Sequence, residues 1–281
     1  MTVNEYCLFI LLSEKLSDKL TPPPKDIIDI PNLSIVLPDK PKRENKILFS
    51  DKKSKIPRLE HLNQKTNRAL AIHHFANHEL MALEIFAWAL LKFQNIDPLF
   101  RRDLFKTLKE EQKHLSLYIN RIHELGMEFG DKPLNFIFWK FTPLMITFDN
   151  FSSIMSLSLE GANLDFATLY SKIFEINGDT ESARIMDLIY KDELSHVKRG
   201  VRVLQKNKNP EESDWEHYSQ NLVFPFTPRR AKGYFYFPET RKKVGFSEEF
   251  IQNLAEYKDE FSNRKKEVIP EELKSWGIYS D

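Results

Sequence analysis

A glutamate followed three residues later by a histidine occurs twice in this chain, each time within a stretch that has the apolar spacing of a helix. The two pairs are Glu111 with His114 and Glu193 with His196. On a helix this spacing puts carboxylate and imidazole on one face, within reach of one metal ion. Because buried carboxylates are costly unless paired or metal-bound, the pairs restrict the chain to folds that gather charge between helices.

Each pair is preceded by a single glutamate in another apolar helical run. Glu79 precedes Glu111 by nearly the same distance along the chain as Glu160 precedes Glu193. Either distance matches one helix, a turn and half of an antiparallel helix. With 25 Glu and eight His in 281 residues, chance alone gives roughly 0.7 Glu-x-x-His pairs. The specific signal is therefore the duplication of the whole set at a nearly constant offset along the chain.

A Glu from each of two helices, combined with Glu-x-x-His from each of two others, is the ligand set of ferritin-like bundles with two metal ions. The chain therefore resembles the ferritin-like di-iron carboxylate proteins over about residues 64–206. The stretches His-Glu-Leu-Met-Ala-Leu-Glu at 78–84 and Asp-Glu-Leu-Ser-His-Val at 192–197 further resemble an uncharacterised ferritin-like family catalogued as a domain of unknown function. That narrower resemblance extends to both terminal arms, and it implies a fold and a metal site but no substrate.

The resemblance implies a pair of metal ions held by six side chains. These are Glu79, Glu111, His114, Glu160, Glu193 and His196. Glu111 and Glu193 would bridge the ions, and each remaining Glu would share one ion with one His. Four carboxylates and two neutral imidazoles carry a charge of about minus four, which two divalent cations cancel. Ligands without sulfur favour two Fe ions over zinc, with Mn or a mixed Mn/Fe pair as the alternative.

Residues close to these ligands are candidates for supporting roles. Tyr118 lies on the face of Glu111 and is the candidate catalytic residue, as a radical or a hydrogen-bonding group; the alternative is an ordinary buried tyrosine. Asp192 and Glu110 are candidates to orient the imidazole of the opposite motif. Asn163, three residues after a ligand, is placed to hydrogen-bond near the site.

Two ambiguities concern the first helix. Glu84 competes with Glu79 as the ligand, but it lies five residues on, roughly 140° around the helix and away from the apolar face. Three histidines, His73, His74 and His78, cluster one or two turns before that ligand. They have either a further metal or proton role, or an ordinary role as packed and partly exposed side chains.

The fold class expected is all-α: a ferritin-like four-helix bundle with one long crossover and irregular terminal arms. The predicted divisions are an N-terminal helix and proline-rich arm over 1–62, the bundle over 63–206, and a C-terminal arm over 207–281. The four long helices are expected at about 63–93, 98–125, 149–176 and 180–205. Asp97-Pro98 and Gly126 mark the start and end of the second helix. The aromatic crossover 127–147 is expected to pack over the bundle.

Composition limits the compartment and the partners. The net charge is zero and the pI is about 7.1, so no overall field draws the chain to nucleic acid or membrane. A single cysteine, Cys7, excludes an intramolecular disulfide and favours the cytoplasm. No apolar run reaches the length of a membrane-spanning helix, and the N-terminus lacks the features of a signal peptide.

The two arms carry basic residues. The stretch 40–58 is basic, and the tail interleaves Phe and Tyr with Arg and Lys around 225–243. Such a tail could stack on single-stranded RNA, but we favour arms that wrap the bundle. Short helices are expected to begin at Ser247 and at Pro270.

Function follows from the expected site. The first hypothesis is a di-iron oxidase or monooxygenase that uses dioxygen on a small organic molecule or a modified nucleoside. The alternatives are iron handling as a ferroxidase, a rubrerythrin-like peroxidase, a tRNA-modifying hydroxylase, or a metal-stabilised scaffold. The sequence identifies no substrate and no electron donor, and a homodimer is compatible with it.

Overall fold

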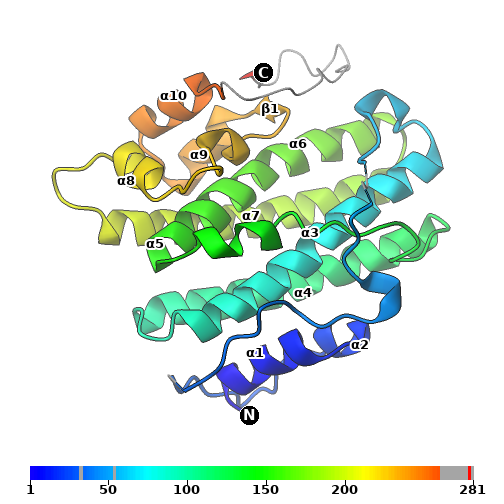
Figure 1. Ribbon diagram of the computed structural model, residues 1–281. Helices are drawn as coiled ribbons and strands as arrows, with labels where there is room; N and C mark the ends of the chain where they lie inside the picture. Colours follow the sequence, from blue (N-terminus) through cyan, green and yellow to red (C-terminus); the bar gives the residue numbers. More distant parts are fainter. Residues whose placement is uncertain (32–33, 53–54, 260–277, 280–281) are drawn as a thin grey trace. The chain divides into compact units, whose positions relative to one another are not determined.

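The computed structural model (Figure 1) describes residues 1–281 except 32–33, 53–54, 260–277 and 280–281. The chain divides into two compact units. Unit 1 comprises residues 1–57 and 64–142, and unit 2 comprises residues 58–63 and 143–281. Each unit is built around one pair of long helices, and the terminal arm of that end of the chain belongs to the same unit.

Unit 1 contains four α-helices and one short 3-10 turn among its described residues. These are α1 (Val3–Leu12), α2 (Leu16–Lys19), η1 (Asn45–Ile47), α3 (Lys65–Lys92) and α4 (Pro98–Glu124). A further 3-10 helix, η3 (Trp139–Leu144), spans the boundary between the units. The single helix expected in the N-terminal arm is therefore two helices, because the chain leaves helical geometry at Ser13, the C-cap of α1.

Helices α3 and α4 form an antiparallel pair, because only the short connection 93–97 joins them. The Asp97 side chain caps α4 by accepting a hydrogen bond from the N–H of Leu99 at 2.8 Å, and Pro98 occupies the first helical turn. The helix ends before Gly126, whose φ of 89° lies in the left-handed region. The predicted boundaries of this helix are confirmed.

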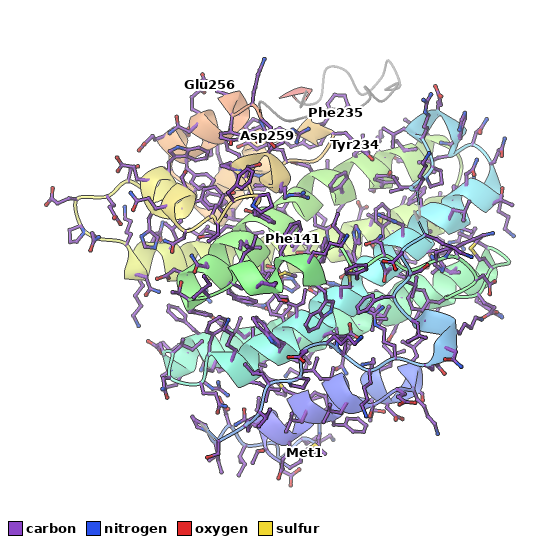
Figure 2. The ribbon with its side chains drawn as sticks, viewed as in Figure 1. Met1, Phe141, Tyr234, Phe235, Glu256 and Asp259 are labelled. Carbon is purple, nitrogen blue, oxygen red and sulfur yellow. The ribbon has the colours of Figure 1, made fainter. Side chains whose placement is uncertain are left out.

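Helix α3 is buried on nearly all sides. Every residue from Leu80 to Leu91 is buried, although the sequence predicts one apolar face. Helix α1 packs against α3. The aromatic segment after α4 covers more of unit 1, and Phe141, labelled in Figure 2, is buried with Trp139. The prediction that the crossover aromatics pack rather than face solvent is confirmed for these two side chains.

Unit 2 is helical with one two-stranded pairing among its described residues. Its elements are η2 (Leu59–His61), α5 (Phe148–Phe151), the π-helix η4 (Ser152–Leu159), α6 (Glu160–Ile176), α7 (Thr180–Asn207), α8 (Asp214–Gln220), η5 (Pro228–Ala231), β1 (Phe235–Tyr236), α9 (Pro238–Val244), α10 (Glu248–Glu256) and β2 (Ile278–Tyr279). Strands β1 and β2 pair antiparallel, with Phe235 opposite Tyr279. The Asp179 side chain caps α7, and Ser247 caps α10 as predicted.

The helix expected over 149–176 changes its winding at η4. The N–H of Glu160 donates to the carbonyl of Met155, five residues back instead of four. The Ser158 hydroxyl donates to the carbonyl of Ser153 at 2.7 Å, and serine side chains of this kind compete with regular helical hydrogen bonds. Apolar spacing does not distinguish the two windings, so the sequence prediction missed the π-helix. Such segments are rare and are frequent at functional sites.

Gly200 on α7 leaves the space that the π-helix occupies. A Cβ at this position would lie 2.8 Å from the Cβ of Ser156 and 2.9 Å from the Cδ2 of Leu157. In the repeat of unit 1, Tyr118 takes the place of Gly200 and Phe75 that of Ser156, and these two ring centroids are 6.0 Å apart. The two repeats therefore fill the same position with a large aromatic pair in one unit and a small pair in the other.

The C-terminal arm packs on α6 and α7 through one hydrophobic cluster. The cluster comprises Leu157, Leu164, Val197, Val201, Leu204, Tyr218, Ala231, Tyr236, Val244, Phe246, Phe250, Ile251 and Leu254. The rings of Phe246 and Phe250 stack with centroids 4.0 Å apart. Tyr234 and Phe235, labelled in Figure 2, continue this packing, since Phe235 is buried and Tyr234 meets Phe166 edge-on. Rings inside this cluster are not available to stack on bases.

The predicted all-α class is confirmed and is consistent with a helical bundle. The sequence prediction missed α8 and α9, and the helix expected to begin at Pro270 falls outside the described residues. The divisions at 62/63 and 206/207 stay predictions. Among the described residues, no helix combines the length and apolar character needed to cross a membrane.

Replacing Gly200 with alanine is expected to lower the free energy of unfolding by about 1–3 kcal/mol, because the new methyl group would displace the π segment. The matched control is Gly161→Ala on α6. A Cβ there finds its nearest atom, the carbonyl oxygen of Ala231, at 4.0 Å. That control should be neutral or stabilising by up to about 1 kcal/mol, as for glycine to alanine in a helix. Denaturant unfolding measures both, and equal effects would contradict the close packing at Gly200.

Candidate metal centre in two half-sites

Half-site 1 comprises Glu79 on α3 with Glu111 and His114 on α4. All three side chains are buried. The Nδ1 atom of His114 lies 3.7 Å from Oε2 of Glu79 and 3.8 Å from Oε2 of Glu111. The i,i+3 spacing places the last two on one face of α4, and the short connection to α3 returns the first beside them. The structure thus brings together the three residues that the sequence predicted for this half.

Half-site 2 comprises Glu160 at the start of α6 with Glu193 and His196 on α7. These three side chains are also buried. The Nδ1 atom of His196 lies 3.7 Å from Oε1 of Glu160 and 3.3 Å from Oε2 of Glu193. The second half-site therefore repeats the composition and the spacing of the first within its own unit.

Asn163 supports half-site 2 from α6. Its Nδ2 donates to Oε1 of Glu193 at 2.8 Å, which ties a carboxylate of α7 to the helix that carries Glu160. The other oxygen, Oε2, is buried and accepts no hydrogen bond from the part of the chain that the structure describes. The predicted hydrogen bond of Asn163 is confirmed, and it leaves one carboxylate oxygen directed toward His196. The position that matches Asn163 in half-site 1 is Ala82, which has no such donor.

The donor set of each half-site suits a metal ion. Two ligand atoms that share one ion at about 2.0–2.2 Å each lie at most about 4.4 Å apart. The imidazole-to-carboxylate distances of 3.3–3.8 Å fall inside that limit. Each half-site buries two carboxylates and one imidazole, so a bound cation would offset charge that burial otherwise disfavours. These buried Glu and His groups could therefore hold metal.

Burial raises the pKa of Glu79 well above its usual range, and the neighbouring Glu111 carboxylate raises it further. A hydrogen bond and the charge of His114 act in the opposite direction without cancelling the rise. In the metal-free chain Glu79 consequently keeps its proton at pH values where an exposed glutamate is ionised. A cation that binds at this carboxylate must displace that proton.

Glu84, the alternative to Glu79, is engaged by cations of the N-terminal arm. Arg43 donates to its two oxygens, from Nε at 3.0 Å and from Nη2 at 2.6 Å. The Nζ of Lys19 lies 3.2 Å from Oε1, and the indole N–H of Trp139 donates to Oε2 at 3.3 Å. Glu84 is fully buried even though it lies off the apolar face, because the arm covers that side of α3. Its carboxylate is saturated by these groups and is not placed to bind a metal ion.

The three histidines before Glu79 occupy separate environments. His73 accepts a hydrogen bond at Nε2 from the N–H of Gly130 at 3.0 Å. His74 and His78 are half-buried, with ring centroids 4.5 Å apart, and His78 also packs on Phe138 at 4.6 Å. Burial lowers the pKa of His73 and of His74 to about 4 and that of His78 well below its usual value. These positions fit packed neutral imidazoles.

The other supporting residues have partial structural support. Tyr118 is buried against Phe75, and its catalytic role stays a prediction. Glu110 lies 3.8 Å from the Nζ of Lys106 on its own helix. That Glu110 and Asp192 orient the imidazoles also stays a prediction.

Sequence reasoning missed the ion pair of Asp165 on α6 with Arg241 on α9, both fully buried. A signal for it exists in the sequence, because Asp165 follows Glu160 by five residues, as Glu84 follows Glu79. Aligning the two sequence repeats places Glu84 and Asp165 at equivalent positions, which identifies both acids. They differ from the candidate ligands in facing an arm of the chain.

In the metal-free chain, Glu79 is expected to make a stabilising contribution to the free energy of unfolding, and this contribution falls as pH rises. The contribution is full below the usual glutamate pKa of 4.5 and is lost as pH rises through the raised value. In that window the unfolded state binds fewer protons than the folded state, so stability declines. Glu79→Gln should flatten this decline and raise the melting temperature near pH 7.

Thermal unfolding with a chelator between about pH 5 and 8 measures the effect as the difference between variant and wild type. That difference is needed because His73, His74 and His78, whose pKa values are lowered in the folded chain, act in the opposite direction up to their usual pKa of 6.5. Glu175→Gln, at an exposed glutamate of α6, is the control. If Glu79→Gln kept the wild-type dependence of melting temperature on pH, the Glu79 carboxyl would not be the source of that dependence.

Comparison with known protein families matches residues 15–252 to the family described as "Protein of unknown function (DUF455)". Neither the curated proteins nor the solved structures contain a match.

Proposed function

The chain belongs to the DUF455 family, and from its two half-sites we propose that it is a di-iron carboxylate protein that activates dioxygen as an oxidase or monooxygenase. The observation that carries this proposal is the repetition of one buried Glu, Glu and His set in each unit. Family membership by itself assigns no activity. The proposal therefore rests on the chemistry of the ligands and on the duplicated pattern.

We further propose that the six candidate ligands of the two half-sites hold two divalent cations per chain. The duplicated sequence pattern supports this, since ferritin-like bundles take such a set from four helices. Charge supports it as well, because the combined set carries about minus four with neutral imidazoles and two divalent cations balance it. In this arrangement Glu111 and Glu193 would be among the carboxylates that hold the two cations.

Oxygen and imidazole ligands without thiolate favour iron or manganese over zinc. Iron held by these residues would supply the reducing equivalents for reaction with dioxygen. The chain contributes the remaining functions. His114 and His196 each present Nδ1 toward two carboxylates, Asn163 orients Glu193, and Glu79 releases its proton when a cation binds. Apolar neighbours on the same helix faces keep bulk water away from these ligands.

The substrate class proposed is a small organic molecule or a modified nucleoside. The aromatic rings of the C-terminal arm are committed to packing, which favours a small molecule over a stretch of RNA. A rubrerythrin-like peroxidase would need a second, cysteine-ligated iron site. The single cysteine, Cys7, is buried, and burial raises its thiol pKa, so it is not suited to that role.

Protein produced with iron is expected to contain about two metal ions per chain, and His114→Ala or His196→Ala should lower that number to about one or less. Each substitution removes the nitrogen ligand of one half-site. His123→Ala is the matched control, because its imidazole is exposed on α4 near its end. Metal analysis after dialysis gives the numbers. A single zinc ion retained by all three variants would exclude the proposed binding of two cations.

The reduced, iron-loaded chain is expected to consume dioxygen, and Glu160→Ala should lower the initial rate at least about tenfold, because it removes a ligand and leaves cation charge uncompensated. Glu175→Ala changes an exposed glutamate on the same helix and should retain the rate. An oxygen electrode measures both. Retention of iron far beyond two ions per chain would establish storage instead, and a loaded chain without oxygen uptake would establish a metal-stabilised scaffold.

A further inference from the structure

A second buried acid lies five residues beyond the first glutamate of each half-site. Glu84 follows Glu79 on α3, and Asp165 follows Glu160 on α6, so the offset that relates the two half-sites also relates these acids. Both carboxylate side chains have an exposure of 0%. Five helical residues correspond to a rotation of about 140°, so each acid lies far around its helix from the candidate ligand.

An arginine of the adjoining arm holds each acid through two parallel hydrogen bonds. In unit 1, Arg43 binds both oxygens of Glu84. In unit 2, Arg241 donates from Nη2 to Oδ2 of Asp165 at 2.9 Å and from Nη1 to Oδ1. Planar, two-pronged binding of a carboxylate is specific to arginine and is lost with lysine. The two halves therefore repeat a buried arginine–carboxylate pair as well as a set of candidate ligands.

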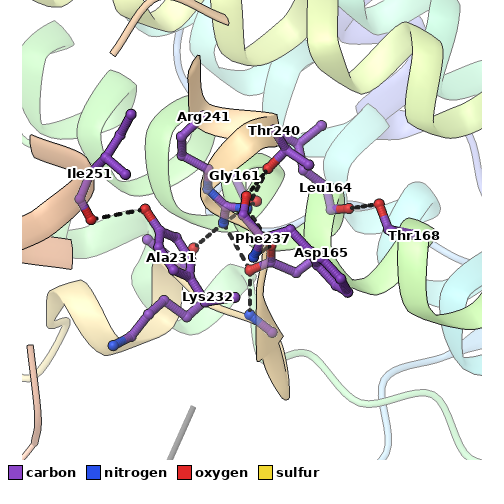
Figure 3. Close-up of polar contacts among 12 residues, drawn as sticks. Gly161, Leu164, Asp165, Thr168, Ala231, Lys232, Phe237, Thr240, Arg241 and Ile251 are labelled. Carbon is purple, nitrogen blue, oxygen red and sulfur yellow. Dashed lines mark hydrogen bonds and ion pairs between the residues drawn. The ribbon is translucent and has the colours of Figure 1, made fainter. Parts of the chain in front are cut away.

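The guanidinium of Arg241 also contacts the backbone of Gly161 in the first turn of α6, as Figure 3 shows. Its Nη2 donates to the carbonyl oxygen of Gly161 at 2.7 Å and to that of Ala231 at 2.7 Å. Gly161 is the residue after the candidate ligand. One side chain of the arm is thus bonded directly to the backbone of the first turn of α6.

Asp165 is bonded to the arm through its backbone as well. It accepts hydrogen bonds from the N–H groups of Gly233 at 2.9 Å and Phe237 at 3.0 Å (Figure 3). Its two oxygens together accept four hydrogen bonds, two from the guanidinium and two from these amides. The acid therefore holds β1 and α9 on α6 at one fixed position.

The position of this attachment is informative because a buried ion pair is a weak source of stability. Well-packed apolar residues often replace such pairs without loss, whereas ion pairs can specify one geometry among several. Here the attachment lies at the junction where η4 becomes α6. A π-helix holds one extra residue, and a shift of that residue along the chain would rotate Glu160 about the helix axis. The hydrogen bond from Arg241 to the carbonyl oxygen of Gly161 fixes the rotation of Glu160 about the helix axis.

We propose that Arg241 is a positioning residue that sets the orientation of Glu160 through Gly161 and Asp165. This inference rests on the proposed metal-binding function of the half-sites. It assigns the C-terminal arm a task beyond covering the helices. This arm supplies the cation that holds one ligand-bearing helix in register.

The test compares Co²⁺ binding by the full wild-type chain and by Arg241→Lys, followed by visible absorption and by metal content after dialysis. Lysine keeps a positive charge near Asp165 but lacks the planar guanidinium that binds both carboxylate oxygens while it also bonds the carbonyl of Gly161. Loss of an outer support of a metal ligand costs about 10–100-fold in affinity. We expect about tenfold weaker binding and an altered visible spectrum, which reports ligand geometry rather than folding. Circular dichroism and thermal unfolding of the metal-free samples show that the variant is folded.

The matched control is Lys232→Met, which removes another buried cation of the same arm. Its Nζ donates to the carbonyl oxygens of Ala255 at 3.1 Å and Tyr257 at 2.8 Å, at the end of α10. This variant should lose stability yet bind Co²⁺ like wild type. If Arg241→Lys kept the wild-type Co²⁺ affinity and spectrum, the inference would be overturned while the proposed metal binding stood. An equal loss of Co²⁺ affinity in Lys232→Met would have the same consequence. Failure of the wild-type chain to take up Co²⁺ would overturn the proposed metal binding and this inference with it.

Discussion

Buried carboxylates between helices impose the constraint on which the other features of this protein depend. A carboxylate removed from water must gain a counter-charge, gain a proton or be surrounded by donors. Glu84 and Asp165 use the first solution, through Arg43 and Arg241. The burial-raised pKa of Glu79 is the second solution in the metal-free state. A cation, which these buried Glu and His groups could hold, would give the half-sites a further counter-charge.

This constraint also explains the terminal arms. Their basic residues invite an interpretation as a nucleic-acid surface, yet Lys19, Arg43 and Arg241 are buried and directed at acids or carbonyl groups of the same unit. The arms are therefore counter-ions for the helix pairs as much as covers for apolar surface. Acids on the long helices can be buried because cations of the arm in the same unit neutralise them. The numbers of acidic and basic residues in the chain are equal.

The two repeats are alike in ligands and attachments but differ in the helix that carries the first glutamate. Helix α3 is regular, with Phe75 beside Tyr118, whereas the matching region of unit 2 is wound as a π-helix against Gly200. A small residue on α7 permits the wider winding, and the wider winding determines where Glu160 starts its helix. Asn163 adds a further difference, since Ala82 holds its place in unit 1. The half-sites therefore have the same kinds of side chain but differ in the winding of the first helix and in the hydrogen bond from Asn163.

The sequence by itself determined the approximate extents of the long helices, the start and end of α4, and the six candidate ligands, but not the π winding before Glu160. Those features depend on residues within one or two helical turns of each other, such as Asp97 with Leu99, or Glu193 with His196. Only the tertiary structure decided that Glu84 pairs with an arginine 41 residues away and that Asp165 pairs with one 76 residues away. Nothing in a local spacing specifies which arm residue reaches which acid. That choice is made by packing, which buries both partners and brings them within hydrogen-bond distance.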